Sequence, residues 1–165
     1  MNENREIIHR FEQYVCWLIS LKDMDERLWH APIAKGKWTV NEVICHIMKW
    51  DRYLLSDVIP ASALSQSIFF PDHDAYNEKA SIYAKSGIKQ IEMIEEAIVT
   101  RKLLANELLK CTDETLEKPL LANGESHCPL TGEPYSLIKF IKDFIYHDEH
   151  HQKQITGLLT ENSPA

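Results

Sequence analysis

The chain has 165 residues, 44% of them hydrophobic, which is enough for one domain whose core folds without disulfides or metal. Its 18 Lys and Arg against 25 Asp and Glu give a net charge of −7 with no basic stretch, which argues against nucleic-acid binding because phosphate would be repelled. No window approaches the roughly 18 apolar residues of a membrane span, and the N-terminus lacks a targeting pattern. We therefore expect a cytoplasmic protein without membrane contact.

The cysteines suggest neither a metal cluster nor a disulfide framework. They are far apart and form no C-x-x-C pair, and they are Cys16, Cys45, Cys111 and Cys128. A zinc ribbon or a small disulfide scaffold would bring them into close, regular spacings. We expect reduced thiols.

The first half of the chain predicts two helices. Apolar residues recur at spacings of three and four from about Asn4 to about Arg27, which is the period of a helix. The stretch KWTVNEVICHI then predicts the start of a second helix, because Thr39 can cap it and Glu42 can complete a capping box. We expect this helix to end near Ile59, because Pro60 follows.

The second half predicts two further helices and a long ordered loop. A helical pattern runs from about Asp74 to about Leu109, with a break or kink at Ser86-Gly87. The segment TDETLEKPLLANGESHCPLTGEPY predicts a loop with a short helical turn at Asp113 to Leu116, and a last helix follows from about Ser136 to about Leu159. Nothing divides the chain, so we predict one all-α domain over residues 1–165, a four-helix bundle.

The run IYHDEHHQKQI places three histidines on the last predicted helix. At about 100° per residue, His147 and His151 lie roughly 40° apart and one turn from each other, a spacing that suits chelation. His150 lies roughly 100° from His151, on the more exposed flank. The H-x-x-x-H spacing alone is a weak signal, and two polar residues at a helix edge explain it equally well.

A further histidine, His46, lies in the second predicted helix among apolar neighbours. A buried neutral imidazole needs a partner, and that partner is more often a carbonyl or carboxylate than a metal. However, one histidine from one bundle helix and an i, i+4 pair from another can reach the same ion. Three imidazoles would leave coordination positions open to water or substrate, as in a catalytic site.

Two longer motifs contain these histidines. KWTVNEVICHIMKWD is similar to the W-[ST]-x-x-E-x-x-x-H-x-x-x-W-[DE] segment, and HDEHHQKQI to the H-x-x-H-H-x-x-Q-I ending, of the DinB-like or YfiT-like superfamily of metal-binding four-helix bundles. DHDAYNEK is a weaker match to the acidic, Asn-containing start of that superfamily's third helix. The resemblance covers nearly the whole chain and implies a metal triad of His46, His147 and His151.

The resemblance leaves the reaction open, since the superfamily includes thiol S-transferases, a thiol-dependent maleylpyruvate isomerase and proteins described as metal-dependent hydrolases. We interpret the chain first as a transferase that adds a low-molecular-weight thiol to electrophilic small molecules. Its divalent ion, which could be zinc, nickel or iron, would stabilise the thiolate. The alternatives are a hydrolase that uses the same site and a binding bundle without turnover. A homodimer is a possible assembly. A deep pocket of mixed polarity beside the metal would favour an enzyme.

Four other residues have two interpretations each. Glu42 is one turn from His46 and could act as a base or support the ligand, but its place in a capping box explains it without chemistry. Asp148 lies near the apolar arc and must be paired, either with a histidine or in a plain buried hydrogen bond. His150 is either solvated or a support for the ligands. Trp50 is either core or a wall of a substrate pocket.

Overall fold

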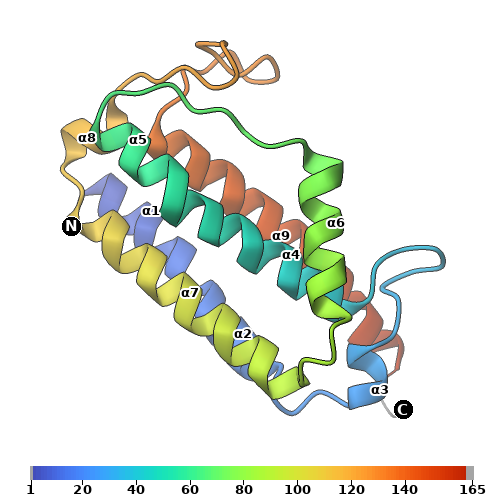
Figure 1. Ribbon diagram of the computed structural model, residues 1–165. Helices are drawn as coiled ribbons and strands as arrows, with labels where there is room; N and C mark the ends of the chain where they lie inside the picture. Colours follow the sequence, from blue (N-terminus) through green and yellow to red (C-terminus); the bar gives the residue numbers. More distant parts are fainter. Residues whose placement is uncertain (1, 163–165) are drawn as a thin grey trace.

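The computed structural model describes residues 2–162, and every regular element among them is a helix (Figure 1). The elements are α1 Glu3–Glu12, α2 Tyr14–Ser20, α3 Glu26–Trp29, α4 Val40–Tyr53, the π-helical turn η1 Leu54–Val58, α5 Ile59–Ala63, α6 His73–Ala84, α7 Gln90–Lys110, α8 Asp113–Glu117 and α9 Leu137–Glu161. Four long rods form the bundle: α1 with α2, α4 with its continuation, α7 and α9. The predicted all-α four-helix bundle is confirmed. None of the described helices is long and apolar enough to cross a bilayer.

The first rod is shorter than predicted. It ends at Ser20 instead of continuing to Arg27, with an irregular residue, Gln13, between α1 and α2. The reason is Asp25, whose side chain accepts a hydrogen bond from the backbone N–H of Arg27 and so caps a separate one-turn helix, α3. That turn brings Trp29 into the core, where it is fully buried.

The second rod begins as predicted and extends further than predicted. Thr39 and Glu42 form the expected capping box at the start of α4. The predicted end near Ile59 was wrong, because the chain stays helical through η1 and α5. Pro60 lies in the first turn of α5, and the wider π-helical turn before it removes the need for a regular hydrogen bond from a residue that has no N–H.

The third predicted stretch forms two separate helices, α6 and α7. The break includes the expected Ser86 and Gly87, and Gly87 has a φ of 93°, in the left-handed region that favours glycine. As a result α6 stands at an angle beside α4 instead of continuing α7 (Figure 1). Asn41 Nδ2 donates to Ala84 O at 2.7 Å and Tyr76 Oη to Lys49 O at 2.6 Å, and these bonds fix α6 against α4.

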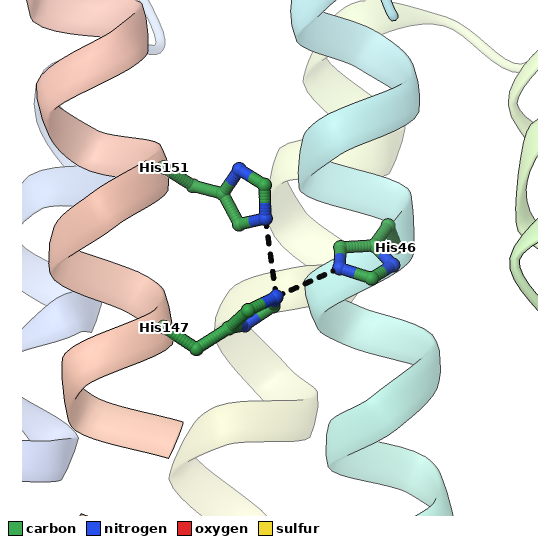
Figure 2. Close-up of side chains that lie close together, drawn as sticks. All are labelled: His46, His147 and His151. Atoms are coloured by element: carbon green, nitrogen blue, oxygen red, sulfur yellow. Dashed lines mark hydrogen bonds between the residues drawn. The ribbon is translucent and has the colours of Figure 1, made fainter. Parts of the chain in front are cut away.

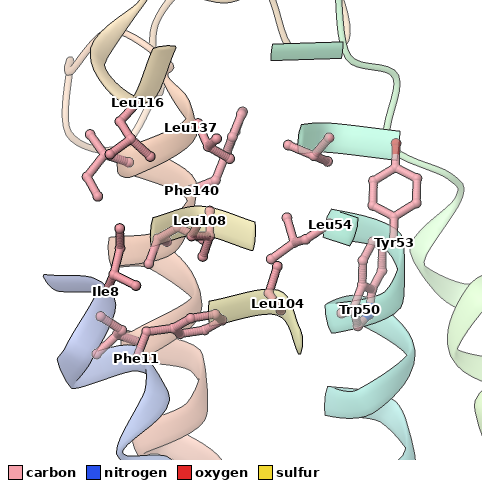
Figure 3. Packing of buried hydrophobic residues seen from close by; sticks show 14 of the residues in the cluster. Ile8, Phe11, Trp50, Tyr53, Leu54, Leu104, Leu108, Leu116, Leu137 and Phe140 are labelled. Carbon is pink, nitrogen blue, oxygen red and sulfur yellow. The ribbon is translucent and has the colours of Figure 1, made fainter. Parts of the chain in front are cut away.

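The core consists of two apolar clusters along the bundle. Figure 3 shows one of them, in which residues from four rods meet: Ile8, Phe11, Leu54, Leu104, Leu108, Leu137 and Phe140. On α4 and α9 this cluster includes Trp50 and Ile145, whereas the other includes Met48 and Ile155. The stretch of α9 between the two clusters therefore contains the histidines of the predicted site.

Candidate metal centre

The fold brings together the three predicted metal ligands. His46 from α4 and the pair His147 and His151 from α9 point their rings at one another (Figure 2). His147 Nε2 lies 3.0 Å from His46 Nε2 and 3.1 Å from His151 Nε2. Nitrogen ligands at about 2.0–2.1 Å around one tetrahedral zinc ion would lie roughly 3.3 Å apart. Two of the three nitrogen spacings are therefore close to those around a single ion, and the ligand nitrogens of the whole triad lie within 4.8 Å of one another.

Hydrogen bonds orient the His46 ring so that its lone pair faces this cluster. Asn77 Oδ1 lies 2.9 Å from His46 Nδ1 and 3.0 Å from Trp50 Nε1. Because the indole N–H can only donate, the Asn77 atom facing both rings is the amide oxygen. An oxygen there requires a proton on His46 Nδ1, which leaves Nε2 with its lone pair free for a metal.

The other two histidines differ in how their Nδ1 atoms are held. His151 Nδ1 lies 2.8 Å from Gln154 Oε1, one turn further along α9, and this bond also leaves Nε2 as the metal-facing nitrogen. His147 Nδ1 is buried and has no hydrogen-bond partner within residues 2–162. Its ring is instead held by packing, with the Phe144 ring centroid 6.3 Å away.

All three imidazoles favour the neutral form that binds metals. Burial, together with the neighbouring His151, lowers the pKa of His46 to about 4. Burial and the neighbouring His151 and His46 lower the pKa of His147 to about 3, and burial also lowers the pKa of His151. A set of three neutral nitrogens suits zinc, nickel or iron and leaves positions open for a further molecule. The residues present therefore fit a divalent ion.

Glu42 and His150 lie beside the triad but have other surroundings. The Glu42 carboxylate accepts hydrogen bonds from the Thr39 cap and from Ser81 Oγ of α6, and Lys85 Nζ is 3.7 Å away. It is therefore engaged on the α6 side of α4. His150 is exposed, with its ring centroid 5.4 Å from that of His151.

Asp148 faces the interior of the bundle rather than the histidines. Its Oδ2 accepts a hydrogen bond from Arg101 Nη1 of α7 at 2.9 Å, and Arg101 also pairs with Asp51 of α4 at 2.8 Å. Burial raises the pKa of Asp148 to about 7, an effect that Arg101 partly opposes. Of the two interpretations made from the sequence, the geometry therefore shows a buried ion pair, and within residues 2–162 Asp148 makes no hydrogen bond to a histidine.

A cavity of about 450 Å³ lies against the candidate metal centre. Its walls come from α4, α6, α9 and two loops, and the lining residues are His46, Trp50, Phe70, His73, Asn77, Ala122, Asn123, Tyr135, Phe140, Asp143, Phe144 and His147. Trp50 fits both interpretations made from the sequence, core residue and pocket wall, since it is 6% exposed and also lines the cavity. The surface beside the triad is therefore hollow and mixed in polarity.

Two loops far apart in sequence close one side of this cavity. Ile68 N donates to Leu121 O and Asn123 N donates to Ile68 O, both at 2.8 Å. Asn123 has a φ of 52°, and its Oδ1 accepts a hydrogen bond from Phe70 N at 2.9 Å. These bonds bring Phe70 and Asn123 to the cavity wall, although no helical period in the sequence could place either residue.

Sequence reasoning gave no role to Asn77 or Gln154, yet both lie inside the motifs that it singled out. Asn77 is the asparagine of DHDAYNEK, and Gln154 is the glutamine of the H-x-x-H-H-x-x-Q-I ending. Their signal was an amide at a fixed distance from a histidine on the same or a neighbouring helix. Metal-binding histidines commonly donate their second N–H to such an oxygen.

Comparison with known proteins agrees with this architecture. A comparison with curated proteins finds no match. Among solved structures, YfiT from Bacillus subtilis, described as a probable metal-dependent hydrolase with an unusual four-helix bundle topology, aligns with a TM-score of 0.71 over 98% of this chain and 89% of its own, at 18% identity. The TM-score and the coverage show a shared fold. The sequence profile of the DinB superfamily matches residues 17–155, and the chain therefore belongs to the DinB superfamily.

Proposed function

We propose that this protein is a metal-dependent enzyme that transfers a small thiol to an electrophilic small molecule. The observation that carries the proposal is the convergence of three imidazole nitrogens, from His46, His147 and His151, beside a cavity of about 450 Å³. A divalent ion bound there would lower the pKa of a thiol below its ordinary value of about 8.5 and so supply a thiolate at neutral pH.

The cavity supports an enzyme over a bundle that only binds metal. Its volume falls within the roughly 300–1,000 Å³ typical of small-molecule sites. Five of the twelve lining residues are Trp, Phe or Tyr, and polar groups, including His73 and Asn77, lie among them. A purely structural metal site would need neither the hollow nor open positions beside it.

The carboxylates near the site favour a thiol over water as the nucleophile. Among the described residues that line the cavity, Asp143 is the one with a carboxylate, and Lys139 Nζ holds it at 2.6 Å. Glu42 and Asp148 are engaged elsewhere. A thiol needs less help than water to lose its proton, since its pKa is far lower than 15.7, the pKa of bulk water.

In the proposed reaction the thiol S–H bond breaks and its sulfur forms a bond to an electrophilic carbon. The leaving group departs with the electron pair of the bond that breaks. His73, an imidazole on the cavity wall outside the triad, is placed to accept the proton that the thiol loses.

Hydrolysis is the second candidate, supported by the description of YfiT as a probable metal-dependent hydrolase. It would use the same three imidazoles, with water in place of the thiol. The two candidates differ in whether turnover requires an added thiol, and this difference can be measured directly.

The test compares the metal-loaded protein with the chelated protein. Each assay contains one thiol, bacillithiol, cysteine or coenzyme A, and monochlorobimane as the electrophile. A variant with all four cysteines replaced is assayed in parallel, because a protein thiol could react with the dye. We expect thiol-dependent turnover that survives in the cysteine-free variant and is lost on chelation. Metal-dependent ester hydrolysis without any thiol would favour the hydrolase. If both activities survive chelation, the reaction does not use the metal.

A further inference from the structure

We infer that the cavity binds an aromatic carbonyl compound whose oxygen accepts a hydrogen bond from the Asn77 amide. The inference rests on the proposed function only in treating this ligand as the substrate, because binding can be measured without turnover. Its observations are the fixed orientation of Asn77 and the arrangement of the aromatic rings around the cavity.

Asn77 presents hydrogen-bond donors in a fixed orientation. Its Oδ1 accepts from both His46 Nδ1 and Trp50 Nε1, so flipping the amide would place N–H groups against two other donors. Its Nδ2 has no hydrogen-bond partner in the described part of the chain, and Asn77 lines the cavity. The two N–H donors are therefore available to a ligand beside the metal centre.

This donor group selects for an acceptor oxygen. An ammonium or another donor placed beside it would lose hydration without gaining a hydrogen bond, which is costly in a partly buried site. Two donors already engage the amide oxygen, and such polarisation strengthens the N–H groups on the same amide. A carbonyl oxygen can accept from these N–H groups without requiring a buried counter-charge.

The aromatic walls favour a flat apolar body for the same ligand. Phe70 and Phe140 meet edge to face with ring centroids 5.4 Å apart, and the Trp50 ring lies 6.3 Å from Phe70. Tyr135 stacks on Phe140 with ring centroids 5.5 Å apart, and Phe144 lies further along α9. Rings at these distances prefer edge or offset contacts with another ring, which an inserted aromatic ligand can make.

The charged groups at the wall do not demand a cationic ligand. Lys139 Nζ contacts both the Asp143 carboxylate, at 2.6 Å, and Glu133 of the loop, at 3.3 Å. Lys139 is only 7% exposed, whereas the Asp143 and Glu133 side chains are 48% and 56% exposed, so water also solvates the two carboxylates. Asp143 therefore already has a cationic partner, so a ligand need not bring a positive charge of its own.

The experiment titrates benzamide and indole into the protein by calorimetry, as purified and after loading with zinc. Both compounds are flat and similar in size, but indole has no acceptor oxygen. Asn77→Asp keeps an acceptor for His46 and Trp50 while removing both N–H donors. We expect Asn77→Asp to weaken benzamide binding about tenfold and to leave indole binding within about twofold or stronger.

Two matched variants complete the design. Asn123→Asp makes the same change of charge and donors on another wall, keeps an acceptor for Phe70 N, and should leave the benzamide-to-indole ratio within about twofold. Phe144→Leu should weaken both ligands, because it removes an aromatic wall. An equal loss of both ligands in Asn77→Asp, a benzamide loss in Asn123→Asp instead, or no binding of either compound by the wild type would overturn the inference. Failure of zinc loading, measured by elemental analysis, would count against the proposed function alone.

Discussion

Two polar clusters begin at neighbouring residues of α9, one half-buried and one fully buried, and they differ in how the hydrogen-bonding capacity of their atoms is satisfied. His147 belongs to the triad, where three imidazole nitrogens converge beside a cavity. Asp148 belongs to an ion cluster with Arg101, in which the five N–H donors of the guanidinium make five hydrogen bonds. The ion cluster has every donor matched and stabilises the bundle. The triad nitrogens face one another instead, an arrangement suited to bind a metal ion.

The ion cluster is closed on all sides. Arg101 is 0% exposed and lies between Asp51 of α4 and Asp148 of α9, and it also donates to the Phe11 carbonyl at 2.9 Å. The Phe11 and Tyr14 rings lie 3.8 Å and 4.3 Å from its guanidinium carbon. Three rods of the bundle thus depend on one side chain, and the comparison predicts its removal to be the most damaging change.

Arg101→Met should lower the free energy of unfolding by about 3–5 kcal/mol, because two carboxylates would be left buried without a counter-charge. Urea denaturation followed by circular dichroism measures this change. Arg52→Met is the control, since its exposed pair with Glu96, at 3.4 Å, should contribute at most about 1 kcal/mol.

If Arg101→Met does not fold, the triple variant that also carries Asp51→Asn and Asp148→Asn keeps the prediction testable. Replacing the two carboxylates removes the unpaired charges, so the triple variant should be more stable than Arg101→Met. Equal instability of both variants would show that packing around Arg101, rather than charge, carries the effect.

The histidine triad is the open cluster, because its nitrogens face a cavity. Replacing one of its ligands should lower metal affinity on the order of 100-fold or more, with a much smaller effect on folding. The variants are His46→Ala, His147→Ala and His151→Ala, each of which removes a coordinating nitrogen. His150→Ala is the matched control, because that histidine is next in sequence but exposed. Competition with a zinc-binding dye measures affinity, and unchanged affinity in His46→Ala would contradict the proposed triad.

The sequence predicted the open cluster better than the closed one, for a physical reason. His147 and His151 are one turn apart on one helix, so local periodicity places them together, and the motif around His46 adds the third nitrogen. The partner of Asp148 is Arg101 on α7, and the facing of two helices depends on packing that periodicity does not specify. The sequence therefore indicated that Asp148 must be paired without identifying its partner.

The fold shows the same division between local and long-range information. The capping box at Thr39 and the break at Gly87 are local signals, and both were predicted. The continuation through Pro60 depends on a π-helical turn, which has no simple sequence signal. The loops around Phe70 and Asn123 are joined by backbone hydrogen bonds across more than fifty residues, and these bonds leave no periodic pattern.

The metal-free triad should make the protein less stable as the pH falls. The folded pKa values of about 4 for His46 and about 3 for His147 lie below the unfolded value of about 6.5, so the unfolded chain takes up protons first. Between pH 7 and pH 5.5 each histidine should lower the free energy of unfolding by roughly 1 kcal/mol, or about 2 kcal/mol together. Urea denaturation of the chelated protein at both pH values measures this loss.

The double variant His46→Gln/His147→Gln is the control, because glutamine does not titrate. It also removes a complication: the raised pKa of Asp148, about 7, means that this group stabilises the folded state as the pH falls, opposite in sign to the histidines. Asp148 is present in both proteins, so its contribution cancels in their difference. Identical pH dependence of the two proteins would show that the histidines are not buried as neutral groups.

The smallest expected effect concerns Glu42, which lies one turn from His46 yet belongs to neither cluster. Its carboxylate caps α4 and accepts a hydrogen bond from Ser81, so Glu42→Ala should lower the free energy of unfolding by about 1 kcal/mol. Thr39→Ala removes the other half of the same cap and should have a similar cost. Metal affinity should stay within about twofold in both variants. A tenfold loss of metal affinity in Glu42→Ala alone would instead place Glu42 in the open cluster, as a group that acts on the ligands.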